Sequence, residues 1–558
     1  MAKRLAITIA GAVSLGSYEA GVLFEVVAAL AAHNAALEKA ASEGVPLLGE
    51  PITIDVLTGA SAGGMTAAIT AQKLLFEADQ LRDPARNALH SAWVVDATIE
   101  SFLRLRSDEQ PLDSILSSTA VDEISRKYLT QRYESSPSAP PSKRPASRHP
   151  AAASRIHLGV ALSNLNGVGF DLPLRPNGEF GYTRHKDDFR VVLDGDASDD
   201  PAIWEGIRSA AVACGAFPFA FRVREIARDR KWFPQGRLRV WPKNPAPFAY
   251  TDGGVFQNEP LGLAKSFVDE IDGHLNTDSR FYLFVSPGGH TSDEDLKFAA
   301  KEATLYRTAG RLVGAVMDQA QFHDWIMAEK MNERIATFDA VAMNLHHALL
   351  SGTLQATNVA PLTSAVIVLM YPATDPASGA ALGSSRARLG SQYSTGYLAL
   401  SAGPGKDIAD LWIDSILVLE NAAALGQHDE MAIYAVTASQ AELASTGLHA
   451  FQGFFSQEYR QHDYNVGRKK ARDVIALINE REDLLGPIHY SPKDVIEIRA
   501  ELNGLTLDKV DRGLREAVYK RVRERLNDTM VAMGLNPIER IAANNLVLPK
   551  LLKKVLAL

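Results

Sequence analysis

Apolar stretches and turns of small residues alternate along the first half of this 558-residue chain. Two apolar, β-type runs, Leu5–Ala10 and Ile52–Thr58, each lead through such a turn into a stretch with helical spacing. The run at 281–286 is expected to be the last central strand of the first unit. Other strands are predicted at 156–163, 169–174 and 189–193, and helices at 17–41, 88–104, 112–128 and 201–213.

Helical patterns dominate after about residue 288. An exception at 364–371 is predicted to be an edge or satellite strand. The last segment, 548–558, places its leucines on one helical face, which suits docking on the protein itself or contact with a membrane surface. The predicted helices of this half are at 294–340, 407–423, 431–445, 468–481, 491–502 and 509–533.

The length of the chain exceeds that of one typical domain. We therefore expect an α/β domain at 1–290 and a mainly helical C-terminal region at 291–558. A Pro/Ser-rich stretch at 134–154 is too poor in apolar residues to order itself, and it is predicted to be a flexible insertion within the first domain.

A serine stands at the turn that follows the strand predicted at Ile52–Thr58. The motif is Gly59-Ala60-Ser61-Ala62-Gly63, and a Gly-x-Ser-x-Gly turn between a strand and a helix is the context of a nucleophile elbow. Gly59 and Gly63 would remove Cβ atoms where the turn is tight and a neighbouring strand passes close. The alternative is a glycine-rich turn with an incidental serine.

The turn after the first strand is also built from small residues. Its main-chain N–H groups, around Gly11, Ala12 and Val13, could form a cradle for an anion or an oxyanion. A dinucleotide fingerprint is disfavoured because Gly11 and Gly16 do not give the Gly-x-Gly-x-x-Gly spacing. A plain strand-to-helix turn remains the other interpretation.

Two aspartates precede glycines at predicted strand ends. Asp252 opens the stretch Asp252–Pro260, and Asp194 stands in a similar Asp-Gly turn without the Asn-x-Pro sequence that follows Asp252. An Asp-Gly pair is by itself a turn signal. The single cysteine, Cys214, is flanked by small apolar residues and is expected to be a packed core residue.

Charge and composition exclude several classes of function. The net charge of −8 argues against a dedicated nucleic-acid binder, and one cysteine excludes an internal disulfide framework. No metal-binding signature is found, and no apolar run approaches the ~20 residues that span a bilayer. The basic and apolar N-terminus mimics a short secretory signal, but we expect a first strand there and a cytoplasmic protein.

Three separated motifs together resemble the patatin-like phospholipase family. They are Gly11–Leu23 with its Gly-Ser-Tyr-x-x-Gly-Val-Leu ending, Gly59–Gly64, and Asp252–Pro260 with Asn258-Glu259-Pro260. The first turn lacks the family's basic residue and is closer to a bacterial patatin-related branch. Phe454-Phe455 and Asp463–Arg468 are similar to the C-terminal extension of that branch.

The resemblance implies a patatin-like three-layer α/β/α sandwich with a mainly parallel central sheet, followed by the helical region. It implies Ser61 as nucleophile, Asp252 as its base and main-chain donors at Gly11, Ala12 and Val13, with no histidine, metal or cofactor. If the oxyanion site demands positive φ, Ala12 would be strained by ~1 kcal/mol.

We therefore expect a serine lipid acyl hydrolase of phospholipase A or lysophospholipase type. It would act on a lipid or phospholipid, meet membranes only peripherally and bind no nucleic acid. An acyltransferase or thioesterase with the same acyl-enzyme is one alternative. A catalytically weak scaffold whose helical half binds a partner is another. The sequence does not determine the oligomeric state.

Overall fold

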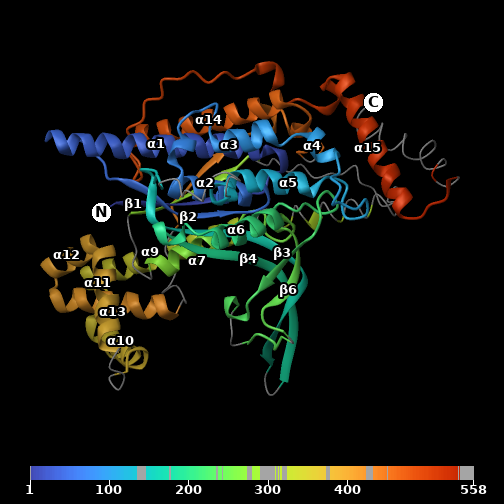
Figure 1. Cartoon of the computed structure of the whole chain (residues 1–558). Helices are drawn as coiled ribbons and strands as arrows, with labels where there is room; N and C mark the ends of the chain where they lie inside the picture. The colour runs from blue at the N-terminus through green and yellow to red at the C-terminus, as the bar shows by residue number, and fades with distance from the viewer. Residues whose placement is uncertain are drawn as a thin grey trace. The chain divides into compact units, whose positions relative to one another are not determined.

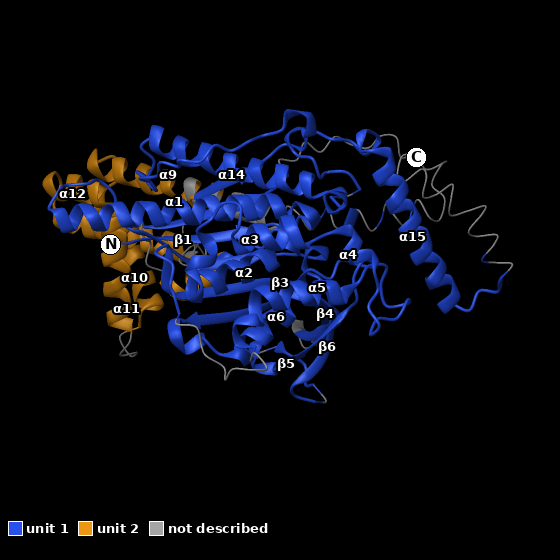
Figure 2. Ribbon diagram, turned by 45° about the horizontal axis from the view of Figure 1, so that its top comes forward, with its two compact units in different colours: residues 1–264, 279–324, 433–558 blue, residues 265–278, 325–432 orange. Residues whose placement is uncertain are grey.

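The computed structural model describes most of the chain and divides it into two compact units (Figure 2). Unit 1 comprises residues 1–264, 279–324 and 433–558, and unit 2 comprises 265–278 and 325–432. Apart from isolated positions between 308 and 319, the described residues are 2–134, 146–174, 178–233, 237–241, 243–272, 279–288, 323–372, 378–422, 431–448, 450–537 and 540.

Unit 1 is built on one mixed, mostly parallel sheet (Figure 1). Its strand order is β5-β6-β3-β2-β1-β7-β8, with β4 paired to β3. Strands β1, β2, β3, β7 and β8 pair in parallel, whereas β3 pairs antiparallel with β4 and β6, and β5 with β6. The bounds are β1 Lys3–Ile9, β2 Ile52–Gly59, β3 Ala152–Leu174, β4 Gly178–Asp194, β5 Arg224–Arg228, β6 Ala246–Asp252, β7 Arg280–Ser286 and β8 Ile433–Thr437.

Several helices of unit 1 alternate along the chain with the strands of the sheet. The helix α2 (Ala62–Phe76) starts directly after β2, and α6 (Pro201–Cys214) begins with a proline and an Asp200 cap. The region predicted as one helix at 88–104 is broken into α3 (Ala88–His90), a π-turn (Ser91–Asp96) and α4 (Ile99–Leu103). The other helices are α1 Gly16–Glu43, α5 Ser118–Ser125, α14 Gln457–Glu480 and α15 Arg512–Ala532.

The long helix α1 packs tightly against α14 in unit 1. A Cβ on Gly21 would lie 2.0 Å from the Tyr464 carbonyl oxygen, and a Cβ on Gly467 would lie 2.1 Å from the Tyr18 carbonyl oxygen. Only glycine allows the two helices to approach this closely. The buried Glu25 of α1 also pairs with Arg468 of α14, so the C-terminal helix is fixed to the start of the chain.

By length and hydropathy, one described helix, Val13–Glu43, could cross a membrane, contrary to the expectation that no run is long enough. In the structure, 61% of its most apolar window is buried inside the protein. Burial of this kind is typical of a core helix in a large α/β domain.

Unit 2 is helical, with a small core of its own around Trp412. The indole ring is fully buried, and its N–H donates to the Ala342 carbonyl oxygen over 2.9 Å. The helices that lie wholly or mostly in unit 2 are α7 Leu261–Asp272, α9 His323–Leu350, α10 Ala356–Met370, α11 Ser378–Gln392, α12 Ser394–Ala402 and α13 Lys406–Ala422.

Several predictions for the second half are wrong. The segment 431–445 is not a helix, because 433–437 forms β8 at the edge of the sheet beside β7. Strand β7 lies between β1 and β8, so the prediction that it is the last central strand is confirmed. The run 364–371 belongs to α10, since a short apolar run cannot be assigned to strand or helix by periodicity alone. The segment 491–502 contains only a 3₁₀ turn at its end.

The domain boundary expected near residue 290 differs from the division that the structure shows, because residues 433–558 return to unit 1. Most of the predicted insertion, 135–145, lies outside the described residues, as does the terminal segment 548–558. The described end of the insertion is held to the body of unit 1: Ser147 exchanges main-chain hydrogen bonds with Phe76 and Ala78, of 3.0 and 2.9 Å.

Two glycines offer a matched test of the close approach at the start of α2. A Cβ on Gly63 would lie 2.4 Å from the Ala10 carbonyl oxygen, whereas a Cβ on Gly206, inside α6, would meet nothing within 4 Å. We expect Gly63→Ala to lower the free energy of unfolding by about 3 kcal/mol and Gly206→Ala to raise it by about 0.5–1 kcal/mol. Denaturant unfolding measures both, and equal effects would contradict the packing described here.

Candidate active site

Ser61 occupies a strained turn between β2 and α2. Its backbone has φ 49° and ψ −124°, which non-glycine residues rarely adopt. The neighbouring glycines make this turn possible: a Cβ on Gly59 would lie 2.3 Å from the Gly63 carbonyl oxygen. The chain therefore turns sharply enough to place the hydroxyl at the N-terminus of α2.

Asp252 lies next to Ser61 although 191 positions separate them in the sequence. The Ser61 hydroxyl donates to Asp252 Oδ2 over 2.5 Å, and the Gly254 N–H donates to Oδ1 over 2.7 Å. Strand β3 brings the two residues together, because β2 ends opposite Val160 and β6 ends opposite Leu162. The two strand ends therefore flank the same short stretch of β3.

The environment of Asp252 favours a proton on its carboxyl group. The residue is only 1% exposed, and this burial raises the pKa of Asp252 to about 7, although hydrogen bonds from Ser61 and Gly254 partly oppose the shift. A carboxylate with a pKa near neutrality can accept a proton more readily than an exposed one, whose pKa is about 3.9.

The first small-residue turn lies directly against Ser61. A Cβ on Gly11 would lie 3.0 Å from the Ser61 Cβ and 2.1 Å from Asn258 Oδ1. The Gly11 N–H donates to the Asn258 carbonyl oxygen over 3.0 Å, and the Asn258 amide donates back to the Gly11 carbonyl oxygen over 3.3 Å. Asn258, in the Asn-x-Pro sequence after Asp252, therefore holds this turn in place.

This bonding changes the expected set of oxyanion donors. The Gly11 N–H is occupied by Asn258, so Gly11 is not available as a donor. The N–H groups of Ala12 and Val13 make no hydrogen bond within the described part of the chain. The backbone strain expected at Ala12 is found at Val13 instead. Ala12 has φ −145°, whereas Val13 has φ 52°, which is in the left-handed region.

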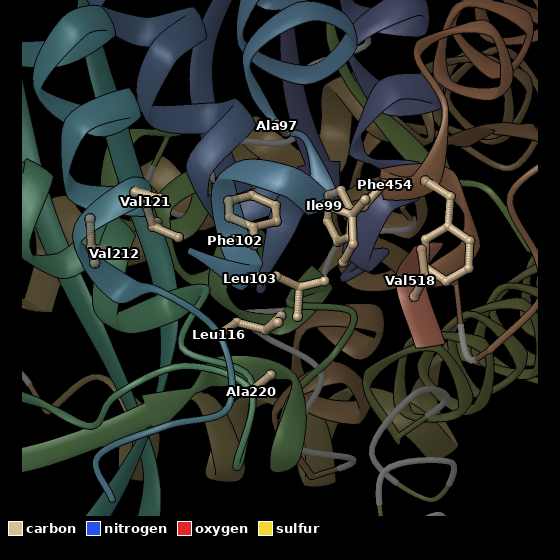
Figure 3. Close-up of a cluster of buried hydrophobic side chains, with 12 residues drawn as sticks. Ala97, Ile99, Phe102, Leu103, Leu116, Val121, Val212, Ala220, Phe454 and Val518 are labelled. Atoms are coloured by element: carbon tan, nitrogen blue, oxygen red, sulfur yellow. The ribbon is translucent and has the colours of Figure 1, made fainter. Parts of the chain in front are cut away.

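An apolar pocket with a cavity volume of about 60 Å³ opens at Ser61. Ser61, Met65 and Ile69 follow one face of α2, so the pocket runs about 12 Å along that helix at 1.5 Å per residue. Several of the residues that line the pocket belong to the buried hydrophobic cluster drawn in Figure 3. The lining residues are Val13, Ser61, Ala62, Met65, Ile69, Ala92, Trp93, Ala97, Phe102, Val121, Ile124, Gly215, Phe217, Phe221 and Phe454.

Comparison with known proteins supports the resemblance seen in the sequence. Residues 7–265 match the sequence model of the family described as patatin-like phospholipase. This segment is a patatin-like phospholipase domain. The match confirms the proposed resemblance and the α/β fold, and it includes Ser61, Asp252 and the turn at Gly11.

One curated relative is similar to part of the chain. The uncharacterized protein y4iI of Sinorhizobium fredii (strain NBRC 101917 / NGR234) is 26% identical over 335 residues, which cover 47% of this chain and 45% of that protein. The matched part of the chain thus spans less than half the length of this relative.

Other candidate residues lie outside the candidate site formed by Ser61 and Asp252. Asp194 pairs with Arg155 on the surface, where both side chains are 57% exposed. Cys214 is fully buried behind the elbow, where burial raises the pKa of its thiol, as expected of a core residue. Within the described residues, no cluster of three or more His, Cys, Asp or Glu side chains could hold a metal ion.

Sequence reasoning missed two parts of this site. Asn258 was visible only as part of a motif, without a role for its side chain. Phe454, which lies far outside the patatin-like domain, lines the pocket with Ser61. The pair Phe454-Phe455 is similar to part of a C-terminal extension, but nothing local in the sequence indicates that it reaches the first turn.

Proposed function

We propose that this protein is a serine lipid acyl hydrolase of phospholipase A or lysophospholipase type. The observation that carries the proposal is the 2.5 Å hydrogen bond from the Ser61 hydroxyl to the buried Asp252 carboxyl. The patatin-like phospholipase match over residues 7–265 supports a lipid ester as the substrate. The apolar pocket beside Ser61 suits an acyl chain.

The proposed reaction proceeds through an acyl-enzyme. Asp252 takes the hydroxyl proton while Ser61 Oγ bonds to the ester carbonyl carbon, and the carbonyl oxygen becomes an oxyanion. When the tetrahedral intermediate collapses, the ester C–O bond breaks and the proton passes from Asp252 to the leaving alcohol. Water then attacks the acyl-enzyme and gives a proton to Asp252. When this second intermediate collapses, the bond between the acyl carbon and Ser61 Oγ breaks, Asp252 returns the proton to Ser61 Oγ, and the fatty acid is released.

Main-chain groups would stabilise the oxyanion. The N–H groups of Ala12 and Val13 have no partner among the described residues, and Val13 lines the pocket with Ser61. Ala62, the first residue of α2, also lines it, and the first N–H groups of a helix have no intrahelical acceptor. The helix dipole adds to this effect at the same place.

Substitution of the two reacting residues tests the proposal. We expect Ser61→Ala and Asp252→Asn each to lower fatty acid release from phospholipid and lysophospholipid micelles by about a thousandfold or more, because either change removes the activated nucleophile. Asp194→Asn is the matched control and should retain full activity, since Asp194 is exposed and paired with Arg155.

A fluorophosphonate probe should label the native protein but not Ser61→Ala. If the folded native protein is not labelled and releases no fatty acid, the scaffold alternative is favoured.

The pKa of Asp252 predicts the pH dependence of the reaction. A base must be ionised to accept the Ser61 proton, and the pKa of Asp252 is raised to about 7 by burial. We therefore expect kcat/KM to rise about tenfold per pH unit below 7 and to level off above it. Asp463, also buried, has a pKa of about 7 for the same reason, so Asp463→Asn should keep this midpoint. If the midpoint near pH 7 disappears in Asp463→Asn, the pH dependence of the reaction comes from Asp463 and not from Asp252, and the prediction is contradicted.

The proposal includes peripheral contact with the membrane surface that holds the substrate. Phe219 is 74% exposed and has φ 66°, and its neighbours Phe217 and Phe221 both line the pocket. An exposed aromatic ring beside a pocket for acyl chains is typical of a lipid contact. Phe219→Ser should weaken co-sedimentation with phospholipid vesicles several-fold, whereas Phe180→Ser, which alters another exposed ring (56%), should not. Equal effects of the two substitutions would contradict this contact.

A further inference from the structure

We propose that Phe454, which lies outside the patatin-like domain, is a specificity-determining residue of the acyl pocket. This inference rests on the proposed function. The residue belongs to a segment of unit 1 that follows strand β8, here called the return segment (450–468). Three independent sets of contacts fix the return segment against the reactive centre.

The first set joins the return segment to the turn beside Ser61. The N–H of Ser14 donates to the Ala450 carbonyl oxygen over 3.2 Å, and the Ser14 hydroxyl donates to the same oxygen. Gly453 lies so close that a Cβ there would be 2.4 Å from Ser14 Oγ. The residue before Ser14 is Val13, so the return segment holds the turn that carries the proposed oxyanion donors.

The second set is aromatic. The ring of Phe454 lies edge-on to Phe102 with 5.0 Å between centroids, and Phe451 lies edge-on to Phe217 at 5.4 Å. Both Phe102 and Phe217 line the pocket. Such pairs contribute about 0.5–1.5 kcal/mol beyond the area that they bury, so Phe454 is held firmly as part of the wall.

The third set comes from a buried arginine. Arg460 is 1% exposed, and its guanidinium donates to the carbonyl oxygens of Gly453, Phe454 and Val94 over 2.8, 3.1 and 3.1 Å. Val94 follows the pocket-lining Trp93 in the π-turn. Arg460 therefore ties the Phe454 wall to the Trp93 wall at a fixed separation.

A fixed wall determines which acyl groups fit the pocket. Phe454 is 4% exposed and belongs to the same buried cluster as Phe102 and Val121 (Figure 3). Interiors are close-packed, so a side chain of this size excludes an equal volume of substrate. Removing the Phe454 ring would widen the pocket, and it would also remove contacts between this wall and a narrow, straight acyl chain of the substrate.

The experiment compares two adjacent phenylalanines. Phe455 lies in the same 3₁₀ turn as Phe454 and is 6% exposed, but it does not line the pocket. We expect Phe454→Ala to raise kcat/KM for a branched or bulky p-nitrophenyl ester, relative to the straight-chain butyrate ester, by about tenfold. The KM for the octanoate ester should also rise. Phe455→Ala should leave both the ratio and this KM unchanged.

The outcomes separate this inference from the proposed function. If the native protein hydrolyses none of the esters and is not labelled by a fluorophosphonate, the proposed function fails and the inference fails with it. If the native protein is active but Phe454→Ala keeps the native ratio, only the inference is overturned. If Phe454→Ala does not fold, Phe454→Leu should shift the ratio in the same direction by a smaller factor, and an unchanged ratio in that variant overturns the inference as well.

Discussion

The hydrogen bond between the Ser61 hydroxyl and the Asp252 carboxyl joins the ends of two strands that flank β3. It can form only because β3 pairs with both β2 and β6 at neighbouring residues, and because Gly59 and Gly63 leave room for a sharp turn. Burial of the carboxyl group raises the pKa of Asp252. The same packing that completes the core therefore also prepares a base for the proposed reaction.

The region from residue 433 onward is part of this arrangement rather than an appendage. It adds β8 to the sheet, places α14 against α1 through Gly21 and Gly467, and brings the return segment to the pocket. The turn at Gly11 is thus held from two directions, by Asn258 on one side and by the Ala450 carbonyl oxygen, through Ser14, on the other. The proposed main-chain oxyanion site needs such support, because fixed N–H groups stabilise charge only when they need not reorganise.

Local sequence patterns were sufficient to predict those parts of the candidate site that are formed by a short stretch of chain. The strand, turn and helix around Ser61 could be predicted because apolar spacing and the positions of Gly59 and Gly63 are local properties. The predictions failed where a neighbour decided the structure: 433–437 became a strand beside β7. The availability of the Gly11 N–H could not be predicted either, because its acceptor belongs to Asn258, far along the chain.

The sequence by itself determined the elbow, the family resemblance and the two residues proposed to react, since each rests on residue types at fixed local spacing. Only the tertiary structure decided which N–H groups remain unbonded, where the backbone strain falls and which distant side chains enclose the pocket. The physical reason is that hydrogen bonding and close packing are satisfied by whichever groups are brought together in space. Val13, Asn258 and Phe454 acquire their places from partners that no local pattern specifies.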